Sequence, residues 1–254
     1  MKKIKFDSKI VSKLVYLVLP IIILSTIGYF LYTYSVDIKQ NCDSYLTKFE
    51  SNTACFLTTE GYIIIKIVPE AAPNGTKRFI ELVNMGFYNN LNFYRVVDDF
   101  VIQGGIQDIA GQLGTHDVID RRNTSEKIKM YNNKFSVETN FDFYGLDEET
   151  KKSLSEQGYQ SSSEIKPLEF KYGTVAFANA GPDSNSTEIF IVVSKDSNSE
   201  SIKSLRGKYT TIGYVLEGSD TIDKILSVKR VLGSDNAISA PTKNIRIIDS
   251  AYKS

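Results

Sequence analysis

The stretch FYRVVDDFVIQGG, residues 93–105, places one arginine among residues that are typical of a strand interior. Arg95 stands two residues after Phe93 and five before Phe100, and Gln103 and a pair of glycines follow. A guanidinium group is costly to bury unless its donors have partners, and it stays charged at every physiological pH. We therefore expect Arg95 to carry chemistry, as a fixed cationic hydrogen-bond donor.

The chain offers little material for other common catalytic chemistry. His116 is the only histidine, and the two cysteines, Cys42 and Cys55, are too far apart for a CxxC metal motif. A zinc site and a Ser-His-Asp triad therefore cannot be assembled in the usual way. We expect no metal and no cofactor.

The elements that must position Arg95 are mostly short strands. Runs of β-branched and aromatic residues alternate with turn residues, which is typical of an all-β domain. Strands are expected within 56–73 (a hairpin turning at Glu60 and Gly61), 93–105, 173–182, 188–194, 210–218 and 245–252. Helices are expected within 74–88, 147–157 and 219–228. This pattern predicts a closed antiparallel barrel capped at its ends.

The N-terminal region predicts a membrane anchor. Residues 14–36 form an uncharged run of 23 residues, long enough to cross the ~30 Å hydrocarbon core of a bilayer. A cleaved signal peptide is the alternative, but the run is too long and no small-residue cleavage site follows it. Residues 1–13 contain five lysines and one aspartate, which favours a cytoplasmic tail and an extracytoplasmic remainder.

The remainder is divided into a polar tether, residues 37–52, and one domain, residues 53–254. The chain without residues 1–13 has 25 basic and 29 acidic residues, a balance that gives no electrostatic footprint for nucleic acid. Cys42 and Cys55 would pair in an oxidising compartment and would be free thiols in a reducing one. We expect a single-pass protein of the cell membrane, with a eukaryotic secretory membrane as the alternative.

Four stretches, in this order, resemble the cyclophilin family of peptidyl-prolyl isomerases. They are TTEGYIIIKIVPEAAP, FIELVNMGFYNNLNFYRVVDDFVIQGG, YGTVAFANAGPDSNSTEIFIV and LRGKYTTIGYVLEGSDTIDKI. The resemblance spans roughly residues 56–252 and implies an eight-stranded antiparallel barrel closed by two helices. It also implies an enzyme that rotates Xaa-Pro peptide bonds without a cofactor and binds proline-containing segments of client proteins.

The resemblance also assigns roles to particular residues. Arg95 matches the catalytic arginine, Gln103 the residue that orients it, and Asn179 a residue that binds the substrate backbone, with Ala178 beside it. The expected proline pocket is formed by Phe100, Val101, Phe190 and Leu205. Tyr209 stands where the family often has histidine, and it keeps an aromatic wall.

Three other departures bear on activity. Val101 replaces a methionine, a modest loss of pocket filling. Glu188 replaces a glutamine near the groove and adds a negative charge within reach of Arg95. Ser204 falls where many members have a tryptophan that helps to bind cyclosporin, so we expect weak binding of that drug. The alternative to an active, membrane-tethered isomerase that assists exported proteins is a catalytically weakened peptide-binding or scaffold module.

A long insertion, about residues 106–170, separates the second and third of these stretches and is rich in charged residues, Asn and Ser. Loops of this length are usually functional or mobile. We expect it either to extend or cover the substrate site or to be a structural decoration, and we interpret His116 as an ordinary loop residue.

Overall fold

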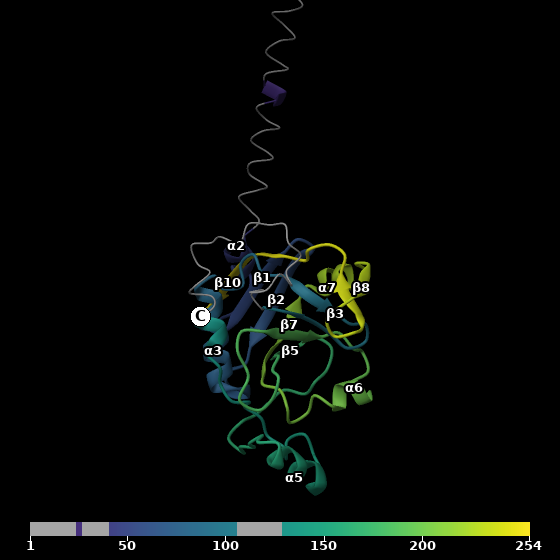
Figure 1. Ribbon diagram of the computed structural model, residues 1–254. Helices are drawn as coiled ribbons and strands as arrows, with labels where there is room; N and C mark the ends of the chain where they lie inside the picture. Colours follow the sequence, from purple (N-terminus) through teal and green to yellow (C-terminus); the bar gives the residue numbers. More distant parts are fainter. Residues whose placement is uncertain (1–23, 27–40, 106–128) are drawn as a thin grey trace, which may run out of the picture.

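An antiparallel sheet of eight strands forms the body of the structure (Figure 1). The computed structural model describes residues 24–26, 41–105 and 129–254. The strand order is β10-β1-β2-β7-β5-β6-β4-β3. The strands are β1 (Thr53–Thr58), β2 (Gly61–Ile67), β3 (Phe93–Val96), β4 (Val101–Gly104), β5 (Thr174–Phe177), β6 (Ile189–Val192), β7 (Thr211–Glu217) and β10 (Ile247–Lys253). Every segment in which the sequence predicted a strand contains one.

The sheet curls into a half-barrel, so the expectation of a closed barrel is corrected. Its edge strands, β10 and β3, meet only at an isolated bridge between Asn92 and Arg246, just before each strand begins. Along its own length β3 lies against β9 (Ile238–Pro241), which pairs with β8 (Arg230–Leu232) in a separate hairpin.

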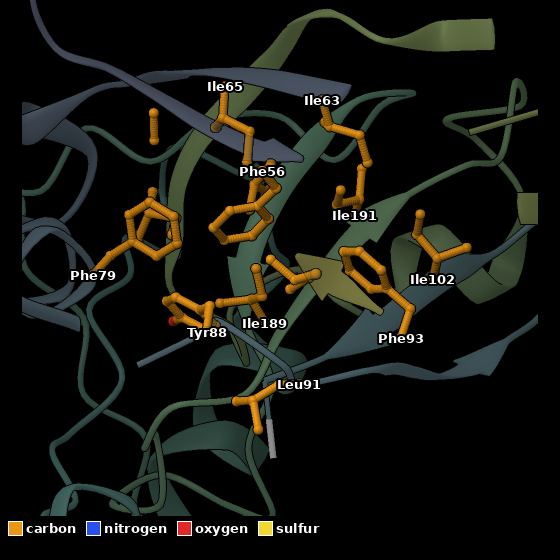
Figure 2. Close-up of a cluster of buried hydrophobic side chains, with 14 of the residues drawn as sticks. Phe56, Ile63, Ile65, Phe79, Tyr88, Leu91, Phe93, Ile102, Ile189 and Ile191 are labelled. Carbon is orange, nitrogen blue, oxygen red and sulfur yellow. The ribbon is translucent and has the colours of Figure 1, made fainter. Parts of the chain in front are cut away.

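The core fills the concave side of the sheet (Figure 2). Phe56, Ile63 and Ile65 from β1 and β2 and Ile189 and Ile191 from β6 are fully buried there. They lie at alternate positions of their strands because successive strand side chains point to opposite faces. The opposite face of β4, β5 and β6 is therefore free to build a second cluster.

Two helices expected from the sequence cover the core. Helix α3 (Pro73–Asn84) buries Phe79, Leu82 and Val83, and α7 (Ser219–Leu226) buries Ile222 and Ile225. Both show the apolar spacing that predicted them. The short elements α2 (Cys42–Leu46), η1 (Pro69–Ala71) and α6 (Glu200–Lys203), and the β8–β9 hairpin, were not expected.

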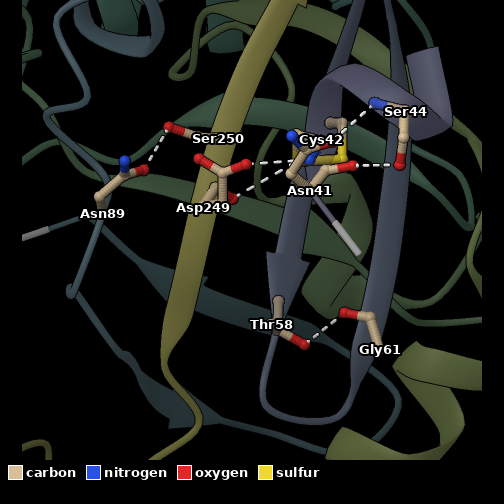
Figure 3. The surroundings of a disulfide bond; sticks show 9 residues. Asn41, Cys42, Ser44, Thr58, Gly61, Asn89, Asp249 and Ser250 are labelled. Atoms are coloured by element: carbon tan, nitrogen blue, oxygen red, sulfur yellow. Dashed lines mark hydrogen bonds between the residues drawn. A yellow bond between two sulfur atoms is a disulfide. The ribbon is translucent and has the colours of Figure 1, made fainter. Parts of the chain in front are cut away.

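A disulfide joins Cys42 of α2 to Cys55 of β1 (Figure 3). Asp249 of β10 accepts a hydrogen bond from the Cys42 backbone N–H, 2.9 Å away. Helix α2 is thereby fixed to the sheet, so part of the segment expected as a tether, residues 37–52, is folded onto the domain.

Most of the expected anchor, residues 14–36, lies outside the described residues. Within the ranges that are described, no helix has both the length and the apolar character needed to span a membrane.

The described part of the insertion, residues 129–170, is packed onto the domain. Helix α5 (Glu148–Glu156) occupies the predicted position, with Asp147 as its N-cap, and lies at the opposite end of the molecule from α2 (Figure 1). Its Leu154 is buried in a small cluster with Val137, Phe141 and Tyr159. Residues 106–128, which include His116, lie outside the described residues.

Candidate active site

The β3–β4 hairpin places Arg95 and Gln103 side by side. They are direct partners in the antiparallel ladder, and Gln103 is in turn opposite Phe190 of β6. Cross-strand partners project from the same face of a sheet. Because Ile102 and Val96 point into the core, this row of three side chains lies on the outer face.

Paired glycines follow Gln103 because two backbones meet there. A Cβ on Gly104 would lie 2.7 Å from the carbonyl oxygen of Asn92. Gly105 adopts a φ of +87°, a conformation that side chains disfavour. The glycines let β4 end tightly against the chain that leads into β3.

A pocket with about 320 Å³ of empty space opens over this row of side chains. Its walls consist of Arg95, Phe100, Val101, Gln103, Ala178, Asn179, Phe190, Leu205 and Tyr209. Nine of the ten residues that the sequence assigned to the site thus share one pocket.

The apolar part of the pocket rests on a second cluster, separate from the main core. Phe190 is 3% exposed and meets the Tyr209 ring edge-on, with 5.4 Å between centroids. Phe170, from the end of the insertion, stacks behind Phe190 at 6.4 Å. Val101 and Leu205 are buried in the same cluster. This packing fixes a small apolar wall that suits a compact ring.

The polar part of the pocket is organised around Arg95. Its Nε donates to Asp235 Oδ2 at 2.7 Å, and its Nη1 lies 3.5 Å from Gln103 Oε1. Its guanidinium carbon is 5.8 Å from the centre of the Phe100 ring, a cation–π distance. Arg95 therefore lies at the boundary between the charged and the apolar parts of the pocket.

Asp235 was not predicted as a site residue. It lies in the turn of the β8–β9 hairpin, and its Oδ1 accepts hydrogen bonds from Ser239 Oγ at 2.6 Å and the Ala237 N–H at 3.1 Å. The bond from Ser239, followed by that from Arg95, lowers the pKa of Asp235 to about 2. The sequence signal is only a turn, GSDNA, which does not indicate a partner 140 positions away.

Glu188 does not line the pocket, and its carboxylate is hydrogen-bonded to Gln103 and Tyr94, not to Arg95. Its Oε2 accepts from Gln103 Nε2 at 2.8 Å and from the Tyr94 hydroxyl at 3.0 Å. Burial raises the pKa of Glu188, and the two hydrogen bonds oppose that effect only in part. Tyr94, adjacent to Arg95 in sequence, was missed because strand tyrosines are usually packing residues.

The Asn179 side chain is used to build the pocket wall. Its Nδ2 donates to the Lys208 carbonyl at 2.9 Å and to Asn185 Oδ1 at 3.1 Å, which occupies both amide hydrogens. These bonds tie the segment after β5 to the residue that precedes Tyr209. Ser204, at the end of α6, is exposed and is not among the pocket residues.

The described part of the chain offers no set of metal ligands. Over those residues, no three His, Cys, Asp or Glu side chains lie close enough together to hold an ion. The pocket instead combines one guanidinium, the side-chain amides of Gln103 and Asn179, and an apolar wall.

Comparison with known proteins identifies the family. Residues 54–251 match the family model described as cyclophilin type peptidyl-prolyl cis-trans isomerase/CLD. The human peptidyl-prolyl cis-trans isomerase-like 1 is 27% identical over 199 residues, 78% of this chain and 89% of the human protein. Isomerase ppi1 of Schizosaccharomyces pombe is 29% identical over 191 residues, covering 75% of this chain and 94% of that protein.

The fold is likewise shared with a solved structure. A cyclophilin type isomerase from Cryptosporidium parvum superposes with a TM-score of 0.53 at 20% identity, over 80% of this chain and 99% of the other. Since the family model spans well over half of its residues, the chain belongs to the cyclophilin-type peptidyl-prolyl cis-trans isomerases.

Proposed function

We propose that the pocket around Arg95 catalyses rotation about Xaa-Pro peptide bonds, with the proline ring against Phe190, Val101 and Leu205. Rotation is slow because the C–N bond has partial double-bond character, with a barrier of about 18–20 kcal/mol. A donor aimed at the prolyl nitrogen withdraws its lone pair from the amide and stabilises the twisted state more than either planar state.

The observation that supports this proposal most strongly is that the guanidinium and the apolar wall share one pocket. Asp235 accepts from Nε of the guanidinium, and Gln103 Oε1 lies beside Nη1. Arginine has five donors, so others remain for the substrate. We assign the Gln103 Oε1 atom and the Asn179 backbone to the peptide chain, because the side-chain amide hydrogens of both residues are already used. The C. parvum isomerase was crystallised in the presence of the dipeptide Ala-Pro, a ligand of this chemical class.

A second candidate function is a peptide-binding module with little turnover. It is favoured by the ion pair between Arg95 and Asp235, because a carboxylate 2.7 Å from Nε offsets part of the positive charge that would face the substrate. Both functions use the same pocket, so only a rate measurement separates them.

The test is the cis–trans exchange rate of a short Xaa-Pro peptide, measured by NMR with the full-length chain. Removing one well-placed donor typically lowers the catalysed rate by about 10²–10³-fold. We expect kcat/KM of Arg95→Ala to fall by this amount, and Arg95→Lys to recover little because an ammonium cannot form the forked contacts. Arg246→Ala, outside the pocket lining, is the matched control. A wild-type chain that binds the peptide without accelerating exchange would establish the binding module.

We also infer that the domain acts outside the cytoplasmic membrane on exported proteins, anchored through residues 14–36. The apolar run, the five preceding lysines and the Cys42–Cys55 disulfide support this. Ser204 supports weak cyclosporin binding, because a small exposed hydroxyl at the end of α6 offers no indole surface to the drug.

A further inference from the structure

We propose that Glu188 is a positioning residue that fixes the orientation of the Gln103 amide and, through it, the Arg95 guanidinium. The proposal rests on the proposed function, because it concerns the same pocket. It assigns a role to a carboxylate that does not line the pocket itself but bonds to Gln103, which does.

The contacts form a closed triangle. Gln103 Nε2 donates one hydrogen to Glu188 Oε2 at 2.8 Å and lies 2.7 Å from the Tyr94 hydroxyl oxygen, which takes the other. The Tyr94 hydroxyl donates its own hydrogen to the same Glu188 oxygen at 3.0 Å. An ionised carboxylate can only accept, so all three hydrogens have one allowed arrangement.

This arrangement decides which end of the Gln103 amide faces Arg95. With Nε2 committed to Glu188 and Tyr94, Oε1 is directed to Arg95 Nη1, 3.5 Å away. The reversed amide would bring its oxygen against the carboxylate and its NH₂ group against the guanidinium, pairing acceptor with acceptor and donor with donor. Glu188 therefore excludes that orientation.

A neutral amide at position 188 would not do this. A glutamine presents either an oxygen or an NH₂ group, so each Gln103 orientation would find a partner. The carboxylate, just before β6, fixes which groups donate and which accept in the contacts that run from Glu188 through Gln103 of β4 to Arg95 of β3.

The placement is unfavourable for folding, which argues for a functional reason. Glu188 is partly buried, and desolvation, the largest influence on it, raises its pKa. For a carboxyl group whose folded pKa is raised, the favourable contribution is complete below the unfolded pKa and is lost as pH rises through the folded pKa. The ionised Glu188 that orients Gln103 at neutral pH thus lowers the stability of the domain.

Few other groups near Glu188 change charge in the acidic range. Tyr94 on β3 and Tyr131 in the insertion are the titratable groups that face it in the described chain, and burial raises the pKa of both phenols. Arg95, beyond Gln103, remains a cation. Asp235, on the other side of Arg95, has a pKa of about 2. Between pH 4 and 8, we therefore expect protonation of Glu188 to lower the rate as the pH falls, which gives an acid limb in the pH profile.

The experiment compares the pH dependence of kcat and KM of the wild-type chain and Glu188→Gln between about pH 4 and 8, with an uncharged Xaa-Pro peptide. We expect wild-type kcat to fall as pH drops through the raised Glu188 pKa. Glu188→Gln should lack that acid limb and have a neutral-pH kcat about 3- to 10-fold lower, with KM changed less than about twofold, because one charge-assisted contact is lost. Glu217→Gln, on β7, is the matched control.

Two further readouts do not depend on turnover. The side-chain NH₂ resonances of Gln103 should titrate with Glu188 in the wild-type chain and not in Glu188→Gln. The variant should also be more stable at neutral pH and should lose the gain in stability on acidification. Tyr94→Phe, which removes one side of the triangle, should lower kcat in the same direction.

Several results would overturn the proposal. They are an unchanged acid limb in Glu188→Gln, a variant kcat at or above the wild-type value at pH 7, or Gln103 amide resonances that do not respond to pH. If Arg95→Ala also retains wild-type turnover, the proposed function fails as well. If Arg95→Ala is inactive while Glu188→Gln behaves as wild type, only the role of Glu188 is refuted.

Discussion

Arg95 is held by two acceptors that come from different parts of the chain. Gln103 is its cross-strand partner, and Asp235 approaches from the β8–β9 hairpin. Asp235 is itself fixed by Ser239 and the Ala237 N–H. A guanidinium held in this way loses less rotational freedom when substrate binds, which favours a fast chemical step.

We predict that Asp235→Ala lowers kcat/KM by about 3- to 10-fold, the effect of losing one charge-assisted contact to Arg95. The kcat/KM of Asp235→Asn, which keeps a neutral acceptor, should lie between that of Asp235→Ala and that of the wild type. Peptide-exchange rates by NMR measure both. Because the pKa of Asp235 is about 2, neither effect should depend on pH above about 4. A rate above wild type would show instead that the carboxylate restrains Arg95 from the substrate.

At the scale of elements, the insertion supports the pocket from behind. Leu154 of α5, Leu146 and Phe141 surround Gly207, where an added Cβ would lie 2.9 Å from Leu154 Cδ1. Gly207 stands between the pocket residues Leu205 and Tyr209. The Glu138 carboxylate also binds the backbone N–H groups of Asn74 and Gly75 in the first turn of α3. The described part of the insertion is therefore integrated into the domain.

We predict that Leu154→Ala raises KM more than it lowers kcat, because the cavity loosens the Leu205–Tyr209 wall but leaves Arg95 in place. Its cost in unfolding free energy should be about 2–5 kcal/mol, as for other buried leucines. Urea unfolding and peptide-exchange kinetics measure the two effects. Lys152→Ala, on the exposed side of the same helix, should change neither. Equal effects of the two substitutions would contradict a role of α5 in the pocket.

At the scale of the whole molecule, the disulfide and the pocket lie on different parts of the sheet. Helix α2 and the disulfide lie on β1 and β10, whereas the pocket is lined by residues of the β3–β4 hairpin, of β6 and of the segments that follow β5 and α6. The disulfide joins the domain to the chain that leads toward residues 14–36. Removal of the disulfide can therefore lower the stability of the domain without changing the pocket.

We predict that replacing Cys42 and Cys55 together by serine lowers the unfolding free energy by about 3 kcal/mol, the value for a closed loop of about 15 residues. Turnover should stay within about twofold of wild type. A reducing agent should destabilise the wild-type chain, measured by urea unfolding, and leave the double variant unaffected. Thiol trapping of the membrane fraction should find both cysteines oxidised, and free thiols there would contradict an exported domain.

The sequence by itself determined the local structure and most of the pocket. The strands and the helices α3 and α7 follow from hydrophobic periodicity, which neighbouring residues set, and α5 was expected within a segment rich in charged residues. Arg95, Gln103, Asn179 and Phe190 were identifiable because the family motifs keep them in contiguous segments. Nine of the ten expected site residues line one pocket for that reason.

The tertiary structure decided the contacts between segments far apart in the chain. Asp235 reaches Arg95 across 140 positions, and Tyr94 reaches Glu188 across 94. The sequence placed Glu188 near Arg95, but only packing directed its carboxylate to Gln103. In the half-barrel, β9 and not β10 lies along β3. Such pairings depend on which surfaces meet after folding, and local propensity carries no information about that choice.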